Sequence, residues 1–241
     1  QGGVFVLRSD ELSADDSALI DTVAHVVLRG KLPNVNAING STEIVPPAEH
    51  LYKPVDVSKM GSEEIPSGES LQLFNGYGGF TPNGREYVIQ LRMDPQTKRL
   101  RYPPAPWINV ISNPHFGFLT SEKGSGYTWS RNSRENKLTP WSNDAVLDPS
   151  GEAIYIRDEE QQYFWSPLPE PVAGSSFYEV RHGFGYSTYQ SKTLNIEQTV
   201  SKWVATDEPI KIVKLHLSNT DLMSKRLSIF SYVDWVLGVF R

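Results

Sequence analysis

The sequence predicts a mainly β fold: a sandwich of antiparallel sheets preceded by one amphipathic helix and an irregular linker. Short apolar runs with period-two alternation recur from residue 71 to residue 236, and Gly, Pro, Asn or Asp bound most of them. One segment near the N-terminus instead carries apolar residues at helical spacing. Short strands at regular spacing, separated by turn residues, are typical of a sandwich.

Residues 1–30 form the first predicted segment, a leading strand and a helix. A short apolar run at residues 4–7 precedes Ser13, which suits a helix N-cap because acidic residues follow it in the first turn. Apolar residues then recur at helical spacing, and Gly30 is a favourable C′ residue. This pattern predicts an amphipathic helix from about Ala14 to Arg29, with one apolar face that packs on another element.

Residues 31–68 form the second segment, an irregular linker. They contain five prolines, scattered Gly and Ser, and no sustained hydrophobic period.

Residues 69–241 form the third segment, the predicted sandwich. Asn219–Asp221 has the composition of a hairpin connection between two strong strands. The sequence ends in an apolar run, 236–241, without a turn or cap, so we expect the sandwich to continue beyond Arg241. The candidate strands are 71–74, 86–92, 154–157, 177–181, 185–193, 194–204, 210–217 and 226–236.

Composition limits the possible functions. The formal net charge is −5 and no basic run is present, which disfavours nucleic-acid binding. The sequence has no cysteine, so disulfides and thiolate zinc sites are excluded. No apolar stretch approaches the roughly 20 residues that cross a bilayer, so we expect no membrane contact by this chain.

The segment 124–144 is the most informative part of the sequence. It combines aromatic faces with forked polar groups, a mixture that suits the apolar face and hydroxyl rim of a sugar and does not match a plain core strand. Alternatively, the tryptophans are buried in the sandwich, but the amides and arginines between them would then need partners. The candidates for ligand contact or domain docking are Trp129, Arg131, Arg134, Asn136, Trp141, Asn143 and Asp144.

A glycine-rich segment, 75–84, presents Tyr77 and Phe80 as further binding or docking candidates. It lacks the spacing of phosphate-binding loops, so we interpret it as a turn whose glycines supply positive φ angles. The five histidines show no paired metal-ligand spacing, and we expect no metal site.

Seven ordered segments of the sequence closely resemble one family of bacterial enzymes. The family is the glycoside-phosphorylase-like region of cyclic β-1,2-glucan synthases, which belongs with the cellobiose and chitobiose phosphorylases of glycoside hydrolase family 94. The resemblance extends over nearly the whole chain, including the opening strand and helix. The segments that carry it are 78–89, 104–118, 124–129, 132–144, 155–158, 165–167 and 182–186.

The resemblance implies that residues from about 70 onward are an N-terminal β-supersandwich, with an (α/α)6 barrel downstream as its docking partner. The family's catalytic and phosphate-binding residues lie in that barrel, so we expect no catalytic residue and no cofactor in this chain. The resemblance implies inorganic phosphate and UDP-glucose for the parent enzyme, a β-1,2-glucan or gluco-oligosaccharide ligand, and possible homodimers. It also implies a bacterial protein on the cytoplasmic side of the inner membrane, within a larger membrane protein.

Three functional hypotheses remain open from the sequence. The first is a non-catalytic domain that binds carbohydrate. The second is a structural domain without sugar affinity, whose aromatic segment packs on the barrel. The third is an independent glycosidase that uses Asp144 or Asp158, which requires two carboxylates about 5–9.5 Å apart.

Overall fold

The computed structural model describes residues 12–23, 52–59, 69–144 and 146–238. The chain divides into two units, Gln1–His50 and Leu51–Arg241. In the first unit, helix α1 (Ala14–Val23) begins where the sequence predicts. Ser13 caps it, since its Oγ accepts the Asp16 N–H at 3.1 Å and donates to the Asp16 carboxylate at 2.6 Å. The predicted continuation to Arg29 and the leading strand lie outside the described residues.

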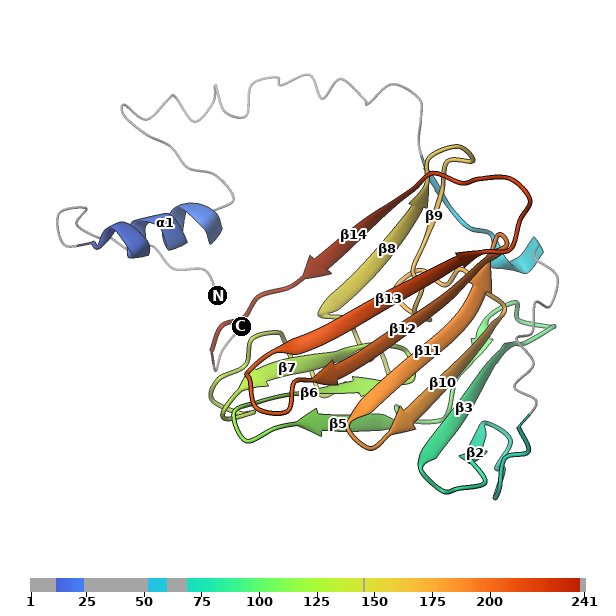
Figure 1. Cartoon of the computed structure of the whole chain (residues 1–241), viewed down its shortest axis with the longest axis horizontal. Coiled ribbons are helices and arrows are strands. Elements are labelled where there is room, and N and C mark those ends of the chain that lie inside the picture. The colour runs from blue at the N-terminus through green and yellow to red at the C-terminus, as the bar shows by residue number, and fades with distance from the viewer. Residues whose placement is uncertain (1–11, 24–51, 60–68, 145, 239–241) are drawn as a thin grey trace. The chain divides into compact units, whose positions relative to one another are not determined.

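The second unit is mainly β, as predicted, and its largest sheet has seven strands in the order β13-β12-β11-β10-β3-β2, with β4 paired to β3 (Figure 1). All of its pairings are antiparallel. The strands are β2 (Gly78–Phe80), β3 (Glu86–Met93), β4 (Leu100–Arg101), β10 (Phe177–Gly183), β11 (Tyr186–Thr193), β12 (Ile196–Val204) and β13 (Lys211–Asn219).

Two smaller sheets accompany the large one. A four-stranded sheet has the order β1-β9-β8-β14, and the 3-10 helix η1 (Val57–Lys59) follows β1 in the chain. A three-stranded sheet has the order β5-β6-β7. The strands are β1 (Lys53–Pro54), β8 (Glu152–Asp158), β9 (Tyr163–Trp165) and β14 (Leu227–Val233), then β5 (Ile108–Ser112), β6 (Phe116–Ser121) and β7 (Gly126–Ser130).

Three predictions of local structure are wrong. Residues 71–74 form only an isolated bridge, Gln72 to Phe80, because Leu73 adopts a φ of 52° that breaks an extended strand. Asn219–Asp221 is not a hairpin connection, because β13 and β14 belong to different sheets. The segment 126–130 is a strand, β7, although its mixed composition argued against one.

Two buried clusters form the apolar core. Tyr178, Tyr189 and Val200 are fully buried where β10, β11 and β12 pack together with β3. Trp165 and Ile156 are fully buried in the four-stranded sheet, and the Trp165 indole N–H donates to Gln198 Oε1 at 3.0 Å, which satisfies its polar atom.

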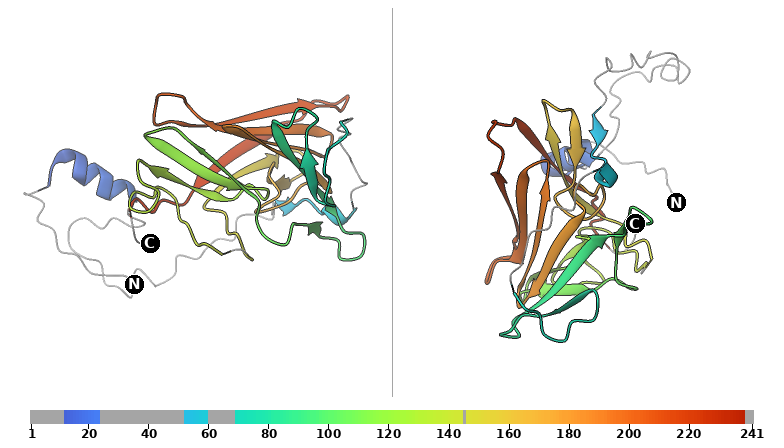
Figure 2. Two further views of the ribbon diagram at one scale, coloured as in Figure 1. Left: turned by 90° about the horizontal axis from the view of Figure 1, so that it is seen from below. Right: turned by 90° about the vertical axis from the view of Figure 1, so that its right-hand side faces the viewer.

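A polar network joins the three-stranded sheet to the large one. The inner face of β6 contacts β11, since Thr120 Oγ1 and the Tyr189 hydroxyl lie 2.8 Å apart. The ammonium of Lys202, on β12, is buried and donates to Gly124 O at 2.8 Å. Lys211, on β13, pairs with Glu152 of β8 and donates to Thr128 Oγ1 of β7 at 3.1 Å. These contacts fix the three-stranded sheet on one face of the large sheet (Figure 2).

Replacing Lys202 by Met is expected to change how stability depends on pH. Burial lowers the pKa of Lys202 to about 7 in the folded chain, from 10.5 for a lysine exposed to water. Between these two pH values Lys202 is protonated in the unfolded chain and largely neutral in the folded chain. The wild-type chain therefore gains stability as pH rises through this window, by up to about 1.4 kcal/mol per pH unit. Urea denaturation of both proteins from pH 7 to 10 measures the difference, and identical slopes would contradict the assignment.

Candidate functional site

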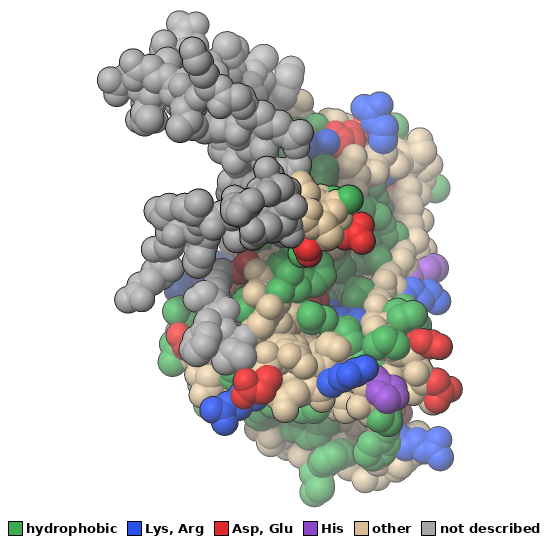
Figure 3. All heavy atoms as spheres, turned by 90° about the vertical axis from the view of Figure 1, so that its left-hand side faces the viewer, with side chains coloured by type: hydrophobic (Ala, Val, Ile, Leu, Met, Phe, Trp, Pro, Cys, Tyr) green, Lys and Arg blue, Asp and Glu red, His purple; other side chains and the backbone are tan. Residues whose placement is uncertain are grey.

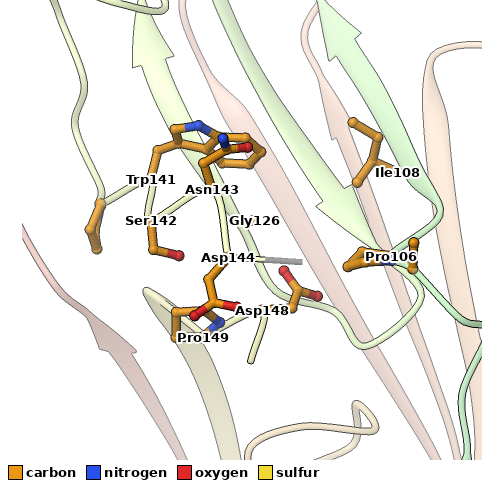
Figure 4. A pocket seen from close by; sticks show the side chains of 11 residues that line it. Pro106, Ile108, Gly126, Trp141, Ser142, Asn143, Asp144, Asp148 and Pro149 are labelled. Atoms are coloured by element: carbon orange, nitrogen blue, oxygen red, sulfur yellow. The ribbon is translucent and has the colours of Figure 1, made fainter. Parts of the chain in front are cut away.

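A pocket of about 270 Å³ lies on the outer face of the three-stranded sheet (Figure 4). Its base includes Ile108 of β5 and Gly126 of β7, and its wall is the segment that leads from β7 to β8. The wall contributes Trp141, Ser142, Asn143, Asp144 and Asp148. The structure thus brings together three of the predicted site residues: Trp141, Asn143 and Asp144.

Trp141 is the exposed aromatic group of this pocket. Its indole packs on the ring of Tyr127 with centroids 4.7 Å apart, and 37% of the residue remains accessible. Tyr127 itself is buried, so it holds the indole against the sheet. Trp141 therefore presents a supported aromatic face to the pocket.

Trp129 has a different environment. It lies on the same face of β7 as Tyr127, with ring centroids 5.1 Å apart, but it does not line the pocket. Its indole covers Gly117 of β6 so closely that a Cβ added at Gly117 would lie 2.5 Å from the ring. Trp129 is half-buried and packs the sheet, while Trp141 faces the pocket.

Two carboxylates line the pocket beside Trp141. Asp144 Oδ1 accepts the backbone N–H groups of Val146 and Leu147, each at 2.9 Å, and these bonds lower the pKa of Asp144. Asp148 Oδ2 accepts the Ser121 hydroxyl at 2.6 Å. Among the described residues, the second oxygen of each carboxylate has no hydrogen-bond partner, which leaves an acceptor for a ligand.

The loop that carries these groups has an uncommon backbone. Asn143 and Asp148 adopt φ angles of 50° and 42°, in the left-handed region. Asn and Asp tolerate that region better than most residues do. The loop geometry thus accounts for the residue types at both positions. It also places the side chains of Ser142 and Asp144 at the same cavity.

A buried acid lies behind the pocket. Glu122 accepts the Trp107 N–H at 2.8 Å, and its other oxygen, Oε1, has no partner in the described part of the chain. Burial raises the pKa of Glu122 to about 7, and the charge of Asp148 acts in the same direction. Glu122 does not line the pocket and offers no contact there.

The two acids of the glycosidase hypothesis do not share this pocket. Asp158 ends β8 and is buried, and its Oδ1 accepts the N–H groups of Glu160 and Gln161 at 2.9 Å, so it shapes the β8–β9 hairpin. The lowered pKa of Asp144 is the reverse of what a general acid requires. Within the ranges described, no group of three acids or histidines could hold a metal ion.

Arg131, Arg134 and Asn136 lie outside the pocket on the exposed turn that follows β7. Asn132 Oδ1 organises this turn by accepting the N–H groups of Arg134 and Glu135 at 2.9 Å. Arg134 forms an ion pair with Glu135 at 3.3 Å. The structure does not bring these three candidates to the cavity that holds Trp141.

Tyr77 and Phe80 belong to a second aromatic group at β2 and β3. Tyr77 meets Trp107 edge-on at 6.1 Å, and Phe80 meets Tyr87 at 4.9 Å. The Arg101 guanidinium lies 4.7 Å above the Tyr77 ring. Trp107 thus links this group in sequence to the pocket, because Pro106 and Ile108 on either side of it line the cavity.

Sequence reasoning missed Ile108 and Asp148 as pocket residues. Ile108 lies in a segment whose Pro, Asn and Ser obscure its alternation, and Asp148 was one acid among many. One feature of the sequence does point to Asp148 as a pocket residue: it lies four residues after Asp144, within a turn-rich stretch.

Gly117→Ala is expected to disturb the aromatic packing next to the pocket. The added methyl group would overlap the Trp129 indole, and we expect a loss of about 1–3 kcal/mol in the free energy of unfolding. Gly238→Ala is the matched control, because a Cβ at Gly238 meets nothing within 4 Å. Urea denaturation measures both variants, and a neutral Gly117→Ala would show that Trp129 is not held as described.

Comparison with known proteins assigns the domain. Residues 85–240 match the model of the glycosyl hydrolase 94 supersandwich domain. The chain is 41% identical, over 71% of its length, to the cyclic beta-(1,2)-glucan synthase NdvB of Rhizobium meliloti, and it covers 6% of that protein. It is 32% identical over 66% of its length to the N,N'-diacetylchitobiose phosphorylase of Vibrio furnissii, and 28% identical over 67% to the solabiose phosphorylase of Paenibacillus borealis.

These relatives support a bacterial origin for the chain. The chain spans 19% of the Vibrio enzyme and 20% of the Paenibacillus enzyme, so it corresponds to a small part of each relative. The match of the family model covers most of the sandwich strands, and the mainly antiparallel sheets agree with it. The chain belongs to the glycosyl hydrolase 94 supersandwich family.

Proposed function

We propose that this domain is a non-catalytic module that binds a gluco-oligosaccharide in the Trp141 pocket, within an enzyme that builds or phosphorolyses glucans. The observation that carries the proposal is the exposed Trp141 indole, supported by Tyr127 and bordered by two carboxylates in one cavity.

The pocket offers both kinds of contact that a pyranose ring needs. The Trp141 face suits the axial C–H groups of a β-linked glucose, which are apolar. The outward oxygens of Asp144 and Asp148 suit its hydroxyl groups, because carboxylate acceptors form short, strong hydrogen bonds with O–H donors. A cavity of about 270 Å³ accommodates one or two sugar units and leaves the rest of a chain outside.

The names of the relatives suggest the role of the parent enzyme. One is a cyclic β-1,2-glucan synthase and others are disaccharide phosphorylases. In our proposal, bond making and breaking, UDP-glucose and inorganic phosphate belong to other domains of the parent, on the cytoplasmic side of a bacterial inner membrane. Within the residues described, no helix combines the length and hydropathy that a bilayer span requires.

A second candidate function is docking of another domain, such as the barrel of the parent enzyme. The observation that favours it is the exposure of Ile108 and Val110, 48% and 56%, on the same face of β5 as the pocket. Exposed apolar side chains also occur elsewhere on the sandwich, as one side of the molecule shows (Figure 3). Such surfaces are typical of interaction sites.

Trp141→Ala is expected to weaken the binding of a β-1,2-linked gluco-oligosaccharide at least about tenfold, because the sugar loses its apolar platform. Isothermal titration calorimetry of the wild-type chain and the variant measures this change. Trp235→Ala is the matched control, since Trp235 is 61% exposed and does not line the pocket.

Wild-type binding that the Trp141 substitution abolishes and the Trp235 substitution leaves intact would support the sugar-binding function. An absence of wild-type binding at high millimolar sugar, with all three proteins folded, would favour docking instead.

A further inference from the structure

We infer that the Trp141 pocket selects uncharged sugars, and that Asp144 and Asp148 are its specificity-determining residues. They would reject ligands that carry a carboxylate or a phosphate, such as a uronic acid or a sugar phosphate. The inference rests on the proposed function, because it specifies the chemical class of ligand that the same pocket takes.

The charge of the pocket lining opposes an anionic ligand. Asp144 and Asp148 contribute two carboxylates, and the described residues of the lining include no Lys, Arg or His. The other polar groups are an amide and a hydroxyl, from Asn143 and Ser142. Lys123 lies near enough to lower the pKa of Asp144, but its ammonium lies 4.8 Å from the Tyr102 ring and does not line the cavity. An anionic ligand would therefore meet two like charges and no cation in the lining itself.

Protein groups hold both carboxylates in place. Asp144 is fixed by two backbone N–H groups and Asp148 by the Ser121 hydroxyl, whose oxygen lies 3.0 Å from Ser125 Oγ. Because these donors engage one oxygen of each group, the second oxygen keeps its position at the cavity. In Figure 4 both carboxylates lie on the side of the hollow opposite Ile108 and below the Trp141 indole.

The direction of hydrogen bonding also favours a neutral sugar. An ionised carboxylate only accepts hydrogen bonds, so the pocket requires a ligand that donates. Sugar hydroxyls donate readily, whereas the carboxylate of a uronic acid and the dianion of a phosphate only accept. The two pocket acids thus match the hydroxyl rim of a neutral sugar in both charge and hydrogen-bond polarity.

The test compares two disaccharides that differ in one group. The first probe is β-1,2-linked glucobiose, and the second is the same disaccharide with C6 of the non-reducing unit oxidised to a carboxylate. Calorimetric titration of the full chain at about 20 mM and about 500 mM salt gives the ratio of the two dissociation constants. We expect the neutral probe to bind on the order of tenfold more tightly at low salt, with a smaller ratio at high salt.

Asp148→Asn should reduce this ratio at least about threefold, since it removes one repelling charge. Asparagine is isosteric and tolerates the φ of 42° at this position, so the loop should keep its conformation. Asp144→Asn is the second variant, because its amide oxygen can still accept the turn N–H groups. Asp207→Asn is the matched control: it removes one exposed acid that does not line the pocket and should leave the ratio unchanged.

Equal binding of the two probes by the wild-type chain would overturn the inference and leave the proposed function intact. A preference for the neutral probe that persists in both Asp148→Asn and Asp144→Asn would also overturn it, because the selectivity would then come from other residues. If neither probe binds, the proposed function fails and the inference fails with it.

Discussion

The structure depends on a small group of charged side chains enclosed between its sheets. Lys211 and Glu152 pair where β13 and β8 approach β7, and Lys202 is buried a short distance away on β12. Burial favours the protonated form of Glu152, but the charge of Lys211 and its hydrogen bond outweigh that effect and lower the pKa of Glu152. Removing Lys211 or Glu152 would leave the other charge largely buried and without its partner, which is a costly change. This network therefore specifies how the three sheets meet.

The orientation of the three-stranded sheet follows from that constraint. Thr120 and Thr128 turn inward to the charged network, so the alternate positions on the same strands turn outward. On the outer face, Tyr127 and Trp129 form an aromatic row, and Trp141 from the following loop completes it. The inner face also carries the buried apolar residues Phe118 and Ile111, so it mixes core packing with the charged network. The outer face carries the aromatic row, which places an aromatic platform beside the pocket.

The alternation of apolar and polar residues along each strand explains where sequence reasoning succeeded and where it failed. In the β10–β13 meander, period-two alternation predicted the strands, and the two-residue turn at Leu194 and Asn195 has the positive φ angles of a hairpin. The strand β7 was missed because its inner face is polar, so its residues do not alternate in the usual way. Trp141, Asn143 and Asp144 were predicted as a group because they adjoin in sequence, whereas Ile108 joins them only through strand pairing across the sheet.

The most direct test of the account is a two-dimensional NMR spectrum of the indole N–H groups, recorded as β-1,2-linked glucobiose is added. The chain has six tryptophans, and single substitutions to Phe assign the signals. The account predicts that the Trp141 signal shifts in a saturable way, with a smaller effect at Trp129, which packs on the same tyrosine, and none at buried Trp165. A spectrum that does not change, or a shift confined to tryptophans outside the aromatic row, would contradict it.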